Sequence, residues 1–123
     1  MMLKTFGLVT ALVALSSVPA FAASVCSEPI APAAVDGTVA TQVQMNSALD
    51  DVKTFIKQSD DYQTCVYREY NQMVADATKD KKPVDPAWKA AVDAKVQANQ
   101  DLKVKVGSEF NTAAVAFNAK HPK

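Results

Sequence analysis

Apolar residues recur every three or four positions between Met45 and Ala77, and this spacing constrains the fold more than any other feature of the sequence. The residues at this spacing are Met45, Leu49, Val52, Ile56, Val66, Tyr70, Met73 and Ala77, with Ser59 and Gln63 at the two polar positions. A period of about 3.5 residues places side chains along one stripe of a helix that packs against a partner helix. The spacing therefore predicts a helix over residues 39–79, with a threonine between Thr38 and Thr41 as its N-cap.

A second helix is predicted over residues 86–118. The segment Asp80-Lys81-Lys82-Pro83 ends the first helix, and Asp85 followed by Pro86 is typical of a helix start. The alternation from Leu102 to Val106 would also fit a strand, but Ala-rich helical sequence lies on both sides of it. The short turn makes the helices antiparallel neighbours, so we predict an all-α fold built on a long, coiled-coil-like antiparallel two-helix hairpin.

A trial register pairs positions whose numbers add up to about 162. It sets Val66 opposite Val96 and Met45 opposite Phe117, and it sets Phe55 opposite Gly107, where a missing side chain would make room for the ring. Charge favours the same pairing, because residues 36–76 carry a net charge of −4 and residues 79–123 a net charge of +4.

The N-terminus has the three parts of a secretory signal peptide. Lys4 is followed by an apolar run and by Ala20-Phe21-Ala22, so we predict a signal peptide at residues 1–22 and a single mature helical domain at residues 23–123. The apolar run is too short for a membrane span, and Val25 is too bulky to precede a lipid-modified Cys26. The predicted location is periplasmic or secreted. The mature chain has a net charge near −1 and no other long apolar segment, which predicts neither nucleic-acid binding nor a membrane span.

Cys26 and Cys65 are the only cysteines, and an even pair in an exported chain is usually a disulfide. The predicted disulfide closes a loop of about 40 residues and is worth about 4 kcal/mol on the chain-entropy model. Pro29 and Pro32 forbid a regular helix before the turn at Asp36-Gly37. Residues 23–38 are therefore predicted to form an extended N-terminal arm that the disulfide staples to the first helix. The alternative is a free, reactive Cys65 with Arg68 one helical turn away.

The segment SDDYQTCVYREY at residues 59–70 concentrates polar and aromatic side chains, and we interpret it as a packed helix face rather than a pocket. The register also brings Gln63 opposite Asn99, with Ser59 near Lys103; this polar layer would fix the register or, alternatively, line a small ligand site. The only histidine, His121, is three residues from the end. We predict no catalytic residues, no metal site and no cofactor, and hence no enzyme.

Four apolar residues fall off the main stripe: Val43, Tyr67, Val104 and Val115. We predict that they form an interaction surface for a protein partner or a second copy of the chain, and that the arm covers the middle of the hairpin. The predicted function is a non-catalytic binding or structural module. The alternatives are a binder of an apolar or envelope ligand between the helices, and a thiol-dependent activity at Cys65.

The pattern C-x2-P-x2-P-x3-DG-x2-AT-x2-QM-x2-A-x3-VK-x-F-x6-Y-x2-C runs from Cys26 to Cys65. It resembles small exported two-cysteine helical proteins of Gram-negative bacteria. The resemblance covers about 40 residues of the chain, and the second helix is similar only in general character. It implies an envelope location and a two-cysteine helical layout, and no activity.

Overall fold

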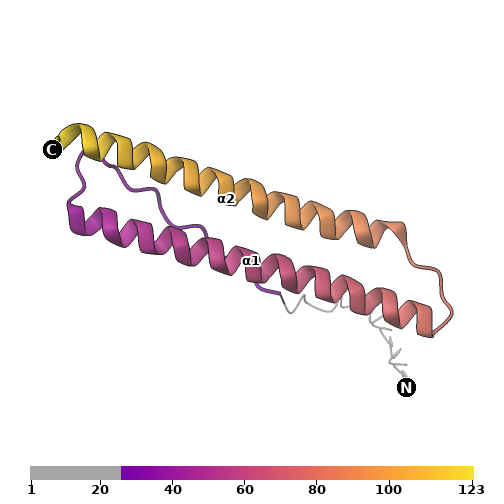
Figure 1. Cartoon of the computed structure of the whole chain (residues 1–123). Helices are drawn as coiled ribbons and strands as arrows, with labels where there is room; N and C mark the ends of the chain where they lie inside the picture. The colour runs from indigo at the N-terminus through magenta and orange to yellow at the C-terminus, as the bar shows by residue number, and fades with distance from the viewer. Residues whose placement is uncertain (1–25) are drawn as a thin grey trace, which may run out of the picture.

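The computed structural model describes residues 26–123, and these residues fold into two long helices, α1 (Gln42–Lys79) and α2 (Pro86–Lys120). Figure 1 shows the helices side by side and antiparallel, joined by the short turn at residues 80–85. No strand occurs in the described part of the chain, and none of its helices is long and apolar enough to cross a membrane. For residues 26–123, the prediction of a fold with two packed helices and no strand is confirmed. The predicted signal peptide lies outside the described residues.

The ends of both helices follow from local hydrogen bonding. Thr41 caps the N-terminus of α1 in a capping box. Gln44 N donates to Thr41 Oγ1 at 3.2 Å, and Thr41 N donates to Gln44 Oε1 at 2.8 Å. Asp85 accepts a hydrogen bond from Ala87 N at 2.8 Å, which confirms the predicted cap of α2. The first helix begins three residues later than predicted, because residues 37–39 form a turn held by Asp36.

Two clusters of buried side chains hold the helices together. Near the open end, Met45 packs with Ala113 and Phe117; nearer the turn, Tyr62 and Val66 pack with Val92 and Val96. These contacts agree with the predicted register to within about one helical turn.

The space expected opposite Phe55 is not used as predicted. A Cβ atom added to Gly107 would meet nothing within 4 Å, so Gly107 faces open space and makes no room for the Phe55 ring. Phe55 is nevertheless buried, and it borders a hollow lined by the arm residues Ile30 to Ala33. The prediction about Gly107 was wrong because the register gives only the height at which two residues lie along the helices. It does not give the direction in which each residue faces around its helix.

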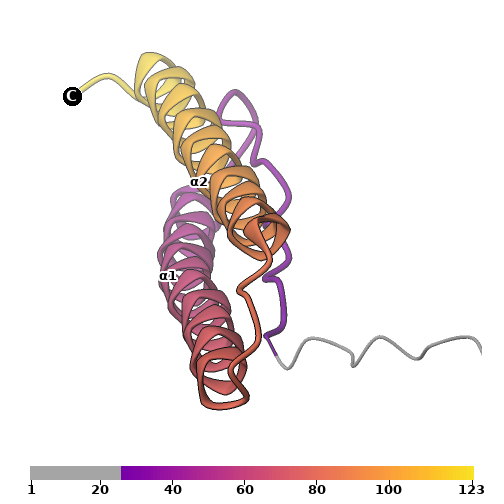
Figure 2. The same ribbon diagram turned by 90° about the vertical axis from the view of Figure 1, so that its right-hand side faces the viewer.

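The arm, residues 26–41, covers one side of the helix pair (Figures 1 and 2). It starts at the disulfide in the middle of α1 and reaches the open end, where Val35 packs against the cluster of Met45, Ala113 and Phe117. It therefore extends further than the predicted cover of the middle. At Gly37 the arm backbone lies so close to α2 that an added Cβ would fall 1.8 Å from the carbonyl oxygen of Ala113.

Candidate functional site

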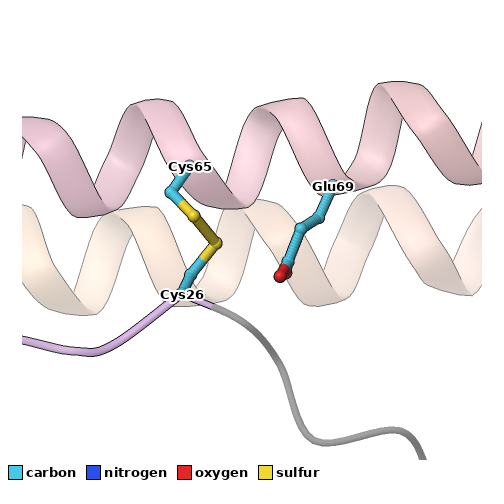
Figure 3. Close-up of side chains that lie close together, drawn as sticks. All are labelled: Cys26, Cys65 and Glu69. Carbon is cyan, nitrogen blue, oxygen red and sulfur yellow. A yellow bond between two sulfur atoms is a disulfide. The ribbon is translucent and has the colours of Figure 1, made fainter.

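The disulfide between Cys26 and Cys65 joins the start of the arm to α1, with the two Cα atoms 5.7 Å apart. Figure 3 shows Glu69 one helical turn after Cys65. Its side chain extends from α1 to the same side of the helix as the disulfide. The sulfur atoms and a carboxylate oxygen of Glu69 all lie within 4.8 Å of one another. Sequence reasoning missed Glu69, although its position four residues after Cys65 places it on the same helix face.

Two cysteines and a glutamate together have the donor atoms of a metal site. The disulfide makes the two sulfur atoms unavailable as thiolate ligands. Metal ions bind thiolates, and here the sulfurs of Cys26 and Cys65 are bonded to each other. Both cysteines of the sequence are used in this bond, so a reactive thiol at Cys65 would require its reduction. In the oxidised protein, Cys26 and Cys65 therefore form a structural cross-link, and the Glu69 carboxylate lies next to it.

Tyr62 lies beside this link and borders a hollow with Cys26, Glu28 and Cys65. Burial raises the pKa of the Tyr62 hydroxyl above its ordinary value, and the negative charges of Glu28 and then Glu69 raise this pKa further. A raised pKa keeps the hydroxyl neutral at physiological pH. Tyr62 therefore acts as a packed, neutral side chain.

The polar layer lies between the helices as the register indicates. Asn99 Nδ2 donates to Ser59 Oγ at 3.2 Å, and Gln63 Nε2 donates to Asn99 Oδ1 at 2.8 Å. The side chains of Ser59 and Asn99 have no exposed surface. Lys103 pairs with Asp60 rather than Ser59. Within the described residues no buried side-chain nitrogen or oxygen lacks a hydrogen-bond partner, so the layer satisfies its own polar groups.

The four residues of the predicted interaction surface are all exposed: Val43 (76%), Tyr67 (39%), Val104 (64%) and Val115 (70%). They do not form one patch. Val43 and Tyr67 lie on α1 at positions about 36 Å apart along the helix axis. Val104 and Val115 lie on α2, where both line one open groove of about 620 Å³. The structure thus brings together only the two valines of α2.

This groove is on the side of α2 that faces away from the arm. Val106, Glu109 and Phe110 contact the arm side, where they line a small hollow with Pro32 to Val35. At 100° per residue, Val104 and Val115 lie about half a turn around α2 from Val106. Sequence reasoning identified the two valines as exposed but not the groove, because the groove depends on Gly107 facing open space.

The fold and these contacts define a protein of two packed helices with one internal disulfide. Comparisons of the chain with family models, with curated proteins and with solved structures gave no match. The resemblance to small exported two-cysteine proteins therefore remains a prediction from the sequence pattern.

Proposed function

We propose that the protein is an exported, non-catalytic binding or structural module of the bacterial envelope. In this proposal the helices form a coiled-coil-like hairpin, and the arm is a brace stapled to α1 by the disulfide. The observation that carries the proposal is the groove on α2, which leaves Val104 and Val115 about two-thirds exposed while the arm covers the opposite side. Exposed apolar side chains that lie close together on an open surface are typical of protein interaction sites.

Export is supported by the disulfide and by the signal-peptide pattern. Disulfides persist in oxidising compartments and are rare where thiol reductants are abundant. A bond that ties the arm to the middle of α1 has a structural purpose, since the arm has no helix or strand of its own to hold it in place.

The two alternatives have weaker support. A ligand at the polar layer would have to break the hydrogen bonds that Asn99 makes with Ser59 and Gln63, and these bonds already satisfy the buried groups. A thiol-dependent activity would first require reduction of the bond between Cys26 and Cys65.

The location is tested by the intact mass of the protein recovered from the cell envelope or medium. We expect a chain that starts at Ala23 and that gains the mass of two hydrogens on reduction. Retention of residues 1–22, or free thiols in the recovered protein, would contradict export in the oxidised form.

The binding surface is tested by site-specific photo-crosslinking in cells that export the chain. A photoreactive residue is placed at Val104 or at Val115, and in a control chain at Ile30, which is 91% exposed but lies on the arm. We expect discrete adducts of defined mass from both α2 positions and none from Ile30. The absence of adducts at Val104 and Val115 would contradict the proposed function.

A further inference from the structure

We propose that the α2 groove binds a second copy of this chain, with the two α2 helices antiparallel across a two-fold axis. The inference rests on the proposed function and names the partner of the same surface. It follows from the symmetry of the residues that line the groove, from the open space at Gly107, and from the way the nearby charges are already paired.

The lining of the groove is symmetric about the midpoint between Glu109 and Phe110. A two-fold axis at this point, perpendicular to α2, exchanges positions whose numbers add up to 219. Four of the seven lining residues then fall into two pairs that meet along the centre of the face, namely Val104 with Val115 and Ser108 with Asn111. A two-fold interface requires such self-complementarity, because each residue on one copy meets its exchanged partner on the other.

The outward stripe of α2 has the same symmetry over a longer stretch. The stripe steps by three and four residues through six exposed positions: Asp101, Val104, Ser108, Asn111, Val115 and Asn118. Its order of polar and apolar side chains is the same in both directions. Apolar residues therefore meet apolar residues, and polar residues meet polar residues, when two copies lie antiparallel in this register.

Gly107 leaves one edge of this face without a side chain, which allows a second helix to approach closely. A Cβ atom at this position would have no neighbour within 4 Å, so the space above Gly107 is open. The two-fold axis brings the edge of α2 that carries Gly107 against the same edge of the second copy, so the missing side chains lie together on one side of the contact. A position without a side chain reduces the separation that two facing helices must keep.

The charges at this face do not oppose the contact. Lys103 is the only charged residue in the lining, and its ammonium group is paired with Asp60 on α1 of the same chain. At the rim, Lys105 Nζ lies 2.8 Å from Glu109 Oε1. The lysines near the groove are thus paired with acids, and two copies can approach without an unpaired positive charge at their centre.

The size of the contact predicts weak association. The stripe from Asp101 to Asn118 is about 26 Å long, and it carries only two large apolar side chains. It should bury less than the roughly 800 Å² per partner of a standard stable interface. We therefore expect a dimer that forms in the micromolar range and dissociates on dilution.

The test is sedimentation velocity on the oxidised mature chain at increasing concentration. The wild type should shift from the monomer towards twice the monomer mass. Val104→Asp and Val115→Lys should each weaken the dimer by about tenfold or more, because each removes two apolar contacts per dimer. Ile30→Asp, an exposed apolar residue on the arm, is the matched control and should leave the association unchanged.

The double variant with Val104→Asp and Val115→Lys tests the geometry itself. In the antiparallel register, Asp at position 104 of one copy meets Lys at position 115 of the other, so association should recover relative to both single variants. A parallel contact would instead set like charges against each other.

A wild type that remains monomeric at all concentrations, or a double variant weaker than both single variants, would overturn the inference. The photo-crosslinking experiment keeps this outcome separate from the proposed function. Adducts from Val104 that contain a different protein, with a monomeric wild type, would retain the binding surface and reject the second copy as its partner.

Discussion

Replacing Gly37 with alanine should destabilise the protein, whereas the same replacement at Gly107 should stabilise it. Alanine normally gains about 0.4–1 kcal/mol over glycine, because it reduces the conformational freedom of the unfolded chain. At Gly37 the new Cβ would lie 1.8 Å from the Ala113 carbonyl oxygen and 2.7 Å from its carbonyl carbon. Both are backbone atoms, so the clash cannot be relieved by a side-chain rotation.

The structure sets the sign and rough size of both effects. Overpacking of a tight contact costs about 1–3 kcal/mol, which at Gly37 exceeds the gain from the unfolded state. The net loss of about 1–2 kcal/mol should lower the Tm by roughly 4–15 °C for a domain of this size. At Gly107, inside α2, an added Cβ meets nothing within 4 Å. Alanine there should gain about 0.5–1 kcal/mol and raise the Tm by roughly 2–8 °C.

Thermal unfolding of the two variants and the wild type, followed by circular dichroism, measures the difference. The scans are made at low protein concentration, so that association does not contribute to the Tm. A Gly37→Ala protein as stable as the wild type would show that the arm does not approach α2 at Ala113. Equal destabilisation by both replacements would refute the argument that the surroundings of each glycine determine the effect.

Reduction of the bond between Cys26 and Cys65 should cost about 4 kcal/mol by the chain-entropy model, and denaturant unfolding with and without reductant measures it; an unchanged midpoint would contradict the role of the staple. Replacing Asn99 with leucine should cost about 1–3 kcal/mol, because Ser59 and Gln63 lose their partner. A double-mutant cycle with Ser59→Ala should then show coupling between these two residues, and additive effects would argue against the layer. The raised pKa of Tyr62 contributes stability that is present below the unfolded-state tyrosine pKa of about 10 and is lost as the pH rises through the higher folded-state pKa. Tyr62→Phe should remove this alkaline loss, and urea unfolding at alkaline pH compares the two proteins.

Local sequence signals were sufficient for the helices and their pairing. The recurrence of apolar residues, the cap at Asp85 and the turn at residues 80–84 act over a few residues each, and they predicted the two packed helices. The pairing of Gln63 with Asn99 followed from the register alone, since antiparallel helices joined by a short turn have few alternative alignments. The disulfide was predictable because the chain has only two cysteines.

The functions of the two glycines were decided by the tertiary structure. In the sequence, Gly37 is part of a turn signal and Gly107 is a gap opposite Phe55. In the fold, Gly37 allows the arm backbone to touch α2, and Gly107 opens a groove on the outside of that helix. The reason is that the register relates positions along two helices, whereas the side on which the arm lies depends on contacts between segments far apart in the sequence.

For the exposed apolar residues, too, the sequence determined one part of the outcome and the tertiary structure the other. Helical periodicity alone shows that Val43, Tyr67, Val104 and Val115 lie off the packed stripe, because this depends only on the angle between successive residues. Whether they gather into one surface depends on how the arm and both helices are arranged. The packed arm leaves Val104 and Val115 together at an open groove, while Val43 and Tyr67 remain far apart on α1. The sequence therefore determined which residues are available for contact, and tertiary packing determined which of them can act together.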